Sequence, residues 1–391
     1  MPHHSNPVYL DYCASTPLDP RVESAMQPYL RESFGNASSA HAQGRLADAA
    51  VEDARERAAR LLNCRPDEIV FTSGGSESDN LALRGAGLAM RRETGRARIV
   101  TTHAEHHAVS RTASSMAAWL GFEAEFVPVD SAGRALAEAV EAVAPGAALI
   151  SLMLANNEVG TLQDVAALAE MAHRHGALFH TDAVQAGGVM ALDMQALGVD
   201  LLSLSAHKFY GPKGAGLLYV RRSTPITPVL TGGGHEQELR AGTSNTPGIV
   251  GMVRALELAA DEREARTALL AARRDQLISG ILGTVAGAYL TGHPTGRLPG
   301  HASFVFDGVD GNLLLMHLDA RGVMASSGSA CTTGNPEPSE VLLALGYSYE
   351  LALSGLRLSA GIHTSEADIE YAIGAVAESV EAVRRLQSAY A

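Results

Sequence analysis

Apolar and polar positions along the chain alternate between a helical and a strand-like pattern from about residue 45 onward. The segment RLADAAVEDARERAARLL (45–62) repeats its apolar positions with helical spacing, whereas DEIVFT (67–72) is short and mostly apolar, as a buried strand is. Further strands are predicted at 97–102, 122–129, 147–154, 177–181 and 201–205, with a helix at 164–176. Strands that alternate with helices form a mostly parallel sheet covered by helices.

A second pattern follows residues 223–248, a stretch dense in Gly, Pro and Thr. The segments predicted there are a long helix at 252–282, strands at 302–308 and 356–361, and a closing helix at 367–390. A chain of 391 residues is also too long for one ordinary core. We therefore predict a large α/β domain of residues 15–260 and a small α+β domain of residues 261–391, which residues 1–14 join.

Composition narrows the function classes. The 30 basic and 43 acidic side chains give a net charge of −13, which argues against a nucleic-acid surface because phosphate contacts need clustered Lys and Arg. The three cysteines (Cys13, Cys64 and Cys331) lie far apart without a CxxC pair, which disfavours a disulfide framework or a zinc ribbon. The first residues do not resemble a signal peptide, and no apolar run approaches the ~18 residues of a membrane span. We expect a cytoplasmic protein that binds neither membrane nor nucleic acid.

Polar residues follow several predicted strands, and ligands bind at the carboxyl ends of the strands of a parallel sheet. After the strand at 67–72 comes SGGSESDN (73–80), a Gly-rich turn into a helix whose backbone N–H groups suit a phosphate. The turn matches neither the Walker pattern nor GxGxxG, so it does not indicate a nucleotide. A plain N-capping turn fits this segment equally well.

Two further strand ends carry charged residues. Asp182 ends the strand ALFHT, where it is either a buried carboxylate facing a cation or the N-cap of a helix. Lys208 comes just after the strand LLSLS, where partial burial lowers the pKa of a lysine and makes it an amine able to form a Schiff base. A phosphate cradle, a carboxylate for a pyridinium nitrogen and such a lysine together are what pyridoxal 5′-phosphate (PLP) needs.

A cluster of histidines follows the strand at 97–102: His103, His106 and His107. A metal site would need these ligands to converge on one face, usually with a carboxylate, and no second His/Cys cluster is evident. An imidazole stacked on an aromatic cofactor, moving protons near neutral pH, suits the PLP interpretation better. The spacing alone does not choose among the three histidines.

Beyond these local signals, nine motifs occur in order over nearly the whole chain. They are YLDYCASTPLDPRV, FGNASSAHAQGR, EIVFTSGGSESDNLA, AEHHAV, ANNEVGTLQD, FHTDAVQ, SLSAHKFYGPKGAGLLYVRR, GGGHEQELRAGT and SSGSACTTGNPEPS. With them the chain resembles the NifS/IscS-like cysteine desulfurases, PLP enzymes of the class-V aminotransferase family. The resemblance implies the fold type I of PLP-dependent transferases, an α/β fold with a large domain built on a mostly parallel sheet of seven-stranded type and a small α+β domain.

The resemblance also implies roles for individual residues. Lys208 would carry PLP, His106 would stack on its ring and assist proton transfer, and Asp182 would pair with the pyridinium nitrogen. The other implied contacts are Gln185 to the phenolic oxygen, Gly75, Ser76, Ser205 and His207 to the phosphate, Thr243 to the phosphate from a neighbouring subunit, Asn157 against the cofactor, and Arg357 to the substrate carboxylate. The role of Thr243 implies a homodimer.

The resemblance makes Cys331 the nucleophile. In such an enzyme Cys331 attacks the sulfur of L-cysteine bound to PLP, alanine leaves, and a persulfide remains on Cys331. The sulfur then passes to an acceptor protein in iron–sulfur cluster assembly, in tRNA thiolation or in a more specialised pathway. The loop has to move between substrate and acceptor, with Gly328 and Gly334 as hinges that Pro336 could stiffen.

Other interpretations remain open at this stage. Selenocysteine could serve as substrate, and a transaminase or β-lyase of the same fold would not use Cys331. A PLP-binding partner platform that has lost catalysis and a zinc hydrolase built on the histidines are more remote. We expect Cys13 and Cys64 to be inert, although Cys13 stands where the family often has a small hydroxyl or amide residue, which leaves a second reactive thiol conceivable.

Overall fold

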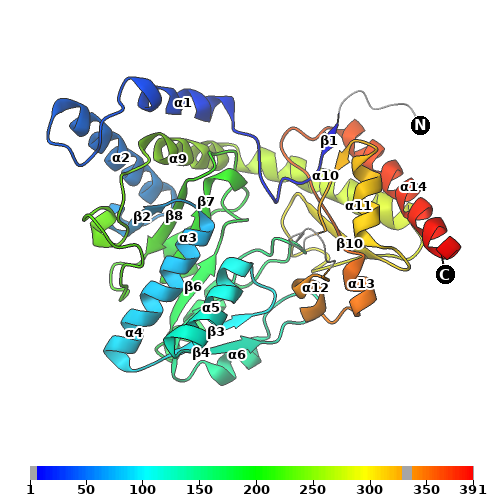
Figure 1. Ribbon diagram of the computed structural model, residues 1–391, viewed down its shortest axis with the longest axis horizontal. Coiled ribbons are helices and arrows are strands. Elements are labelled where there is room, and N and C mark those ends of the chain that lie inside the picture. The colour runs from blue at the N-terminus through cyan, green and yellow to red at the C-terminus, as the bar shows by residue number, and fades with distance from the viewer. Residues whose placement is uncertain (1–6, 328–336, 391) are drawn as a thin grey trace.

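The largest sheet of the protein has seven strands in the order β2-β8-β7-β6-β5-β3-β4 (Figure 1), in a computed structural model that describes residues 7–327 and 337–390. The strands are β2 (Ile69–Thr72), β3 (Arg98–Thr102), β4 (Glu123–Val127), β5 (Ala147–Ser151), β6 (Leu178–Asp182), β7 (Leu201–Ser205) and β8 (Gly216–Val220). Neighbouring strands are parallel except β8, which runs antiparallel to both β2 and β7. The predicted mostly parallel sheet is confirmed, with β8 as a strand that the sequence pattern had not indicated.

Helices cover both faces of this sheet, which explains why its strands read as continuous apolar runs. One face packs against α1 (Pro20–Arg31), α2 (Ala42–Leu61), α6 (Ala137–Val143), α7 (Val165–Arg174), α8 (Met194–Leu197) and α9 (Thr246–Asp261). The other face packs against α3 (Gly75–Asn80), the π-helical turn Leu81–Ala86, α4 (Gly87–Thr94) and α5 (His107–Leu120). Each face therefore buries its own apolar cluster.

A separate apolar core forms around two smaller sheets. Strand β10 (His301–Phe306) pairs antiparallel with β9 (Ala288–Leu290) and β12 (Leu356–Ser359), and β1 (Val8–Tyr9) pairs parallel with β11 (Val323–Met324). The helices that pack here are α10 (Arg263–Thr284), α11 (Gly311–Asp319) and α14 (Glu366–Tyr390), and the short helices α12 (Glu340–Ala344) and α13 (Tyr349–Leu353) lie beside β10 (Figure 1). The division into domains at residue 260 stays a prediction.

The long helix predicted at 252–282 is wrong in one respect, because the structure has two helices there. Glu262, with φ −102° and ψ 7°, lies between α9 and α10 and leaves the helical conformation. Its carboxylate accepts hydrogen bonds from Arg21 Nη1 at 2.5 Å and from Arg266 Nη2 at 2.7 Å. The break allows α9 to pack on α1 and α2 while α10 packs on α14.

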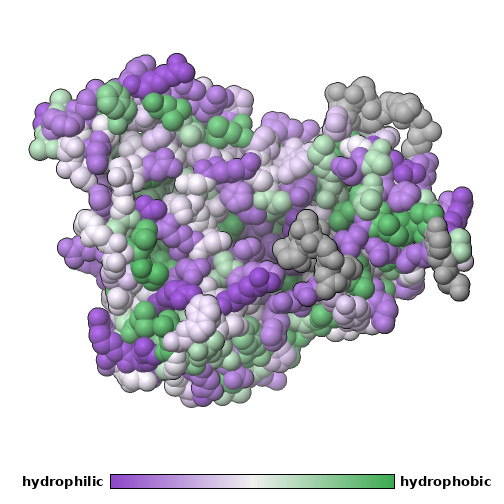
Figure 2. All heavy atoms as spheres, viewed as in Figure 1, coloured by the Kyte–Doolittle hydropathy of each residue, from purple (hydrophilic) through white to green (hydrophobic). Residues whose placement is uncertain are grey.

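The surface is largely polar on the face that Figure 2 shows, and apolar side chains appear there in small separate groups. One such group lies over α1, where the exposed apolar residues are Leu18, Leu30 and Phe34. Within residues 7–327 and 337–390, no helix is both long and apolar enough to cross a membrane.

Candidate active site

A cavity of about 170 Å³ lies where the carboxyl ends of β2, β5, β6 and β7 meet, and its wall includes residues from the loops after these strands and after β3. It is lined by Gly75, Ser76, Asp79, His106, Met153, Asn157, Asp182, Val184, Gln185, Ser205, His207 and Lys208. Nine of these were candidate site residues in the sequence; Asp79, Met153 and Val184 were not. Segments up to 133 residues apart in the chain (Gly75 to Lys208) therefore form one wall.

The start of α3 forms one end of the cavity. A Cβ atom added to Gly75 would lie 2.7 Å from Val184 Cγ2, and one added to Gly216 would lie 2.5 Å from Gly74 Cα, so the backbone approaches closely at both glycines. The hydroxyls of Ser76 and Ser205 border the same end. The sequence expectation of a Gly-rich turn into a helix is confirmed, and the turn offers the hydroxyl and N–H donors that an anion needs.

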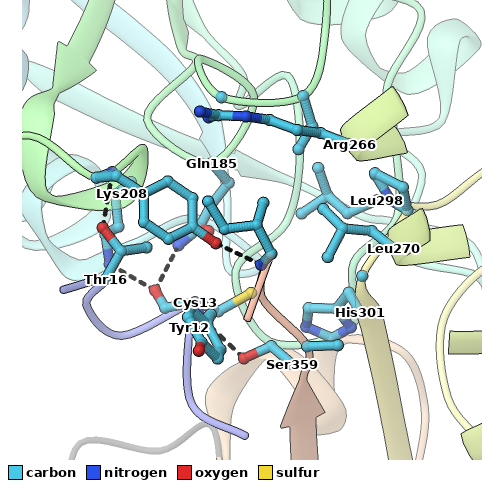
Figure 3. A pocket seen from close by; sticks show the side chains of 17 residues that line it. Tyr12, Cys13, Thr16, Gln185, Lys208, Arg266, Leu270, Leu298, His301 and Ser359 are labelled. Atoms are coloured by element: carbon cyan, nitrogen blue, oxygen red, sulfur yellow. Dashed lines mark hydrogen bonds between the residues drawn. The ribbon is translucent and has the colours of Figure 1, made fainter. Parts of the chain in front are cut away.

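Lys208 ends a short helical turn (Ala206–Lys208) directly after β7, and Figure 3 shows it close to the N-terminal segment. Its Nζ donates to Cys13 O at 2.6 Å and to Ala14 O at 3.0 Å. Burial lowers the pKa of Lys208, and the Arg357 cation lowers it further against the opposing charge of Asp182. The lysine therefore gives up its proton more readily than an exposed one, in the direction expected from its position after a buried strand.

Asp182 is the last residue of β6 and is 5% exposed. One carboxylate oxygen accepts the Val184 N–H at 2.8 Å. Burial raises the pKa of Asp182, and the charges of His106 and Lys208 oppose that shift. The chain continues in turns to α8, so the alternative that Asp182 is the N-cap of a helix is wrong.

The three histidines of the cluster face different partners. His106 is the N-cap of α5, and its Nδ1 accepts the Ala108 N–H at 3.1 Å, which leaves the ring proton on Nε2. The His103 ring stacks on Phe126 with centroids 4.3 Å apart, and His107 Nε2 lies 3.9 Å from the Glu340 carboxylate. Because the rings diverge, a metal centre built on all three histidines has no support here.

Burial against the cavity wall lowers the pKa of His106, although the charge of Asp182 opposes the shift. A metal site could also be considered at Asp79, His106 and Asp182. Among the described residues, these three each have a possible metal-ligand atom within 4.8 Å of those of the other two. The His106 ring contributes poorly to such a group, because one nitrogen already accepts a hydrogen bond and the other then carries the proton.

Arg357 lies in the middle of β12, next to the cavity, and is 5% exposed. Its Nη1 donates to Asn157 O at 2.8 Å and its Nη2 to Asp11 Oδ1 at 2.7 Å. The Nε of Arg357 and the Oδ1 of Asn157 are buried and have no hydrogen-bond partner among the described residues. The Arg357 Nε–H can donate to a carboxylate, whereas Asn157 Oδ1 is an acceptor and can only receive a hydrogen bond from a bound group.

A second, smaller cavity of about 60 Å³ is also lined by Lys208 (Figure 3). It shares Lys208 and Gln185 with the first cavity and is also lined by Cys13, Arg266 and His301. The Cys13 sulfur points toward His301 in this view, and burial raises the pKa of its thiol. The thiol is therefore mostly protonated at neutral pH, which agrees with an inert Cys13.

The Cys13 carbonyl was missed by sequence analysis. It accepts hydrogen bonds from both Lys208 Nζ and Gln185 Nε2, the latter at 3.1 Å. A backbone carbonyl leaves no signal in the residue type, so only the folded chain reveals this contact. The other remote cysteine, Cys64, has its pKa raised to about 12 by burial and by nearby acidic residues.

Three predicted site residues are not among those that line the cavity: Arg357, which contacts Asn157 beside it, Thr243 and Cys331. Thr243 is exposed in the segment before α9, and its predicted contact is with a second subunit. Cys331 lies outside the described residues, as do Gly328, Gly334 and Pro336. Cys331 therefore stays a sequence prediction.

The described residues on either side of the 328–336 segment lie beside the site. Ser326 and Arg357 exchange both backbone hydrogen bonds, at 2.6 and 3.2 Å. On the other side, Ser339 Oγ donates to the Glu158 carboxylate at 2.5 Å, one residue from Asn157. Ser326 and Ser339, the described residues that flank this segment, therefore lie next to Arg357 and Glu158.

Comparison with known proteins yields consistent matches. The model of the family described as "Aminotransferase class-V" matches residues 8–372. The chain is 43% identical over 380 residues to a protein named cysteine desulfurase IscS from Dictyoglomus turgidum, covering 97% of this chain and 96% of that protein.

Solved structures give the same result. A structure named "NIFS-LIKE PROTEIN" has a TM-score of 0.89 and 36% identity, covering 96% of this chain and 99% of the other. A structure described as SspA in complex with cysteine has a TM-score of 0.80 and 34% identity, covering 91% of this chain and 99% of the other. These likenesses confirm the fold expected from the sequence, a large mostly parallel sheet of the PLP-transferase type.

Proposed function

The chain belongs to the class-V aminotransferase family, and from this premise we propose that it is a cysteine desulfurase that uses PLP. It takes the sulfur of L-cysteine as a persulfide on Cys331 and releases L-alanine. The observation that carries the proposal is the single cavity in which Lys208, Asp182 and His106 meet. The names of the relatives, and the neighbour described with bound cysteine, support this reaction over a transaminase or β-lyase.

The residues of the cavity fit PLP. Lys208 would attach it, Asp182 would hold its ring nitrogen, and Gln185 would donate to its phenolic oxygen. The phosphate would lie at the start of α3, where Gly75, Ser76, Ser205 and His207 border the cavity and the close backbone approach at Gly75 leaves no room for a side chain. When bound, PLP supplies an electron sink that weakens bonds next to the substrate Cα.

The protein's own groups then divide the work. The Arg357 guanidinium orients the substrate carboxylate through its Nε–H, which lacks a partner, and Asn157 Oδ1 offers an acceptor to a donor group of the bound molecule. His106 holds a proton on Nε2 at the cavity wall, and Lys208, with its lowered pKa, accepts and returns protons at the substrate Cα. Partial removal from water lowers the pKa of both groups, so each gives up its proton at a lower pH than it would in open solution.

Cys331 performs the sulfur transfer. Its thiolate attacks the sulfur of the bound L-cysteine, an S–S bond forms, and the substrate C–S bond breaks. The carbon fragment keeps the electron pair and takes up a proton, so that alanine leaves. Support comes from the neighbours of the 328–336 segment, because Ser326 pairs with Arg357 and Ser339 contacts Glu158.

The proposal includes a homodimer, in which Thr243 reaches the phosphate of the partner's site, and a sulfur-acceptor protein. The exposed position of Thr243 and the exposed apolar residues around α1 support a subunit contact. A cytoplasmic location is part of the same proposal, supported by three widely spaced cysteines that suit a reducing compartment.

The test is an assay of the PLP-loaded protein with L-cysteine and a reductant. We expect sulfide and alanine in equal amounts from the wild type, and the loss of sulfide in the Cys331→Ser variant. Cys64→Ser is the matched control, because Cys64 lies away from the cavity and its thiol titrates only at about 12. Pyruvate in place of alanine, or a Cys331→Ser variant as active as the control, would rule out this mechanism.

A further inference from the structure

Asp79 is a buried acid in the cavity wall to which the sequence and the proposed function assign no role. It lies in α3, one helical turn after Gly75, and is 1% exposed. It lines the cavity together with Asp182, and the two side chains bring carboxylate oxygens within 4.8 Å of each other. A buried carboxyl group needs either a cation or a proton.

The groups around Asp79 do not provide a cation. The ring of His180 in β6 approaches Asp79 Oδ1 at 3.6 Å, too far for a hydrogen bond, and both its nitrogens already bond serine hydroxyls: Nδ1 to Ser151 at 2.8 Å and Nε2 to Ser203 at 3.0 Å. Burial lowers the pKa of His180 to about 3, so its ring is neutral. Among the described residues no lysine or arginine pairs with Asp79, and its Oδ1 has no hydrogen-bond partner.

The other titratable groups nearby favour a proton on Asp79. Burial, the charge of Asp182 and the charge that Glu105 carries once it ionises raise the pKa of Asp79 well above its usual range, although a hydrogen bond from Ser203 opposes the shift. Asp182 differs because it accepts the Val184 N–H, has Lys208 as a positive neighbour, and lies within 4.8 Å of a nitrogen of the His106 ring. Of two close carboxyl groups, the one with donors and cations ionises and the other keeps its proton.

We propose that Asp79 is a positioning residue that stays uncharged, so that its carboxyl group can close on Asp182 from within 4.8 Å and donate its proton in a hydrogen bond; Asp182 is the carboxylate that would hold the ring nitrogen of PLP. The inference rests on the proposed function for the role of Asp182. Asp79 thus prevents a second negative charge beside the ring and gives Asp182 a hydrogen-bond donor. An asparagine in its place would keep the shape, the neutrality and a donor, whereas an alanine would keep only the neutrality.

The first test measures the protonation state in the cofactor-free protein by infrared difference spectroscopy at pH 7. Glu105 contributes an acid band of its own at pH 7, so we expect the wild-type minus Asp79→Asn difference spectrum to contain a carboxylic-acid C=O band from Asp79. Glu105→Gln is the matched control, because it removes a different buried acid and leaves the band of Asp79 in place. A wild-type minus Asp79→Asn spectrum with carboxylate bands alone would overturn the proposal, whatever the enzyme's activity.

The second test measures PLP affinity and the visible absorption of bound PLP as a function of pH. We expect Asp79→Asn to bind PLP with nearly the wild-type dissociation constant, and Asp79→Ala to bind about tenfold more weakly with a shifted spectral midpoint, the loss expected for one hydrogen bond to a charged group. If Asp79→Asn binds as weakly as Asp79→Ala, a negative charge is needed and the proposal fails.

Two further outcomes would also overturn it. An Asp79→Ala variant that matches the wild type in both affinity and spectral midpoint would reduce Asp79 to a packing role. Stoichiometric zinc in the purified wild type, lost in Asp79→Asn, would make Asp79 a metal ligand instead. These readouts do not depend on sulfur transfer, so a failure of the desulfurase proposal would appear separately in the assay with L-cysteine. If Asp79→Ala fails to fold, the infrared comparison with the isosteric Asp79→Asn still decides the question.

Discussion

At the scale of single residues, the site buries an unusual number of acids. Asp79, Glu105 and Asp182 are each at most 5% exposed, and burial raises the pKa of all three. Such acids cost free energy when they ionise, so a protein retains them where a group with a matched pKa is useful. The cost makes the stability of the protein depend on pH in a way that can be measured.

Glu105 provides the clearest test of this dependence. One of its carboxylate oxygens accepts the Met153 N–H at 3.0 Å, and burial raises its pKa to about 8. In the unfolded chain the group ionises at its ordinary pKa of about 4.3, so between that value and about 8 the folded state holds more protons. The contribution of Glu105 to the free energy of unfolding therefore falls as pH rises, by up to about 1.4 kcal/mol per pH unit.

Glu105→Gln removes this titration. We expect the free energy of unfolding of the variant, relative to the wild type, to rise steadily from pH 5 to pH 8 when the cofactor-free proteins are melted. Glu370→Gln, an exposed change in α14, should show a constant difference over the same range. A constant difference for Glu105→Gln as well would mean that its carboxyl ionises as readily in the folded protein as in the unfolded chain.

At the scale of elements, strand ends and helix starts build the site. The strands β2, β3, β5, β6 and β7 run in the same direction, so their carboxyl ends meet at one edge, and α3 and α5 start there. A helix start offers N–H groups that need partners, and His106 meets one of them at the beginning of α5. The same side chain therefore serves both the helix and the cavity.

These two roles of His106 can be separated by substitution. His106→Ala should lose both the cap and the ring, and an N-cap loss costs about 1 kcal/mol of stability. His106→Asn should recover most of that stability, because asparagine caps helices well, but it should not recover desulfurase activity. Thermal melting of the cofactor-free variants and the alanine assay measure the two effects.

The outcome depends on which property His106→Asn restores. Equal melting temperatures for both variants would show that the cap contributes little. Activity in His106→Asn would show that the ring of His106 has no part in proton transfer, and that its role is to shape the start of α5.

At the scale of the whole molecule, the chain brings its two ends to the site. The N-terminal segment supplies Cys13 O to Lys208, and Asp11 pairs with Arg357 in β12, 346 residues later. Ser326, which exchanges backbone hydrogen bonds with Arg357 of β12, comes shortly before the segment that contains Cys331. The proposed substrate side of the site would therefore be built from the second core, and the proposed cofactor side from the seven-stranded sheet.

The proposed dimer predicts complementation between subunits. In the proposed dimer each site takes Lys208 from one chain and Thr243 from the partner. A mixed dimer of one Lys208→Ala chain and one Thr243→Ala chain would therefore have one site with both substitutions and one site with neither. When equal amounts of the two variants are unfolded and refolded together, half of the dimers should be mixed, with one intact site of two in each. About a quarter of the wild-type activity should therefore return at limiting PLP. Activity no greater than the mean of the separately refolded variants would mean that Thr243 does not act across subunits.

The sequence by itself determined the fold class and most of the residues that line the cavity. Short apolar strands alternating with helices specify a parallel sheet, and polar residues directly after such strands must gather at one edge, which is why Asp182, Lys208 and the turn at Gly75 could be found without coordinates. The motifs of the family added the expected roles of the other site residues, which are Gln185, Ser205, His207, Asn157, Thr243, Arg357 and Cys331.

Only the tertiary structure decided what depends on packing between distant segments. Asp79 lies in a polar stretch that looks exposed in the sequence, and the packing of α3 against β6 and β7 is what buries it beside Asp182. The contact of Lys208 with Cys13 O involves a backbone atom that every residue type has. The sequence pattern is helical without interruption across Glu262, but the structure has two helices there, because α9 packs on one core and α10 on another. The periodicity of a sequence shows which face of an element is buried, but not which residues pack against that face. The environment of Asp79 depends on those packing partners.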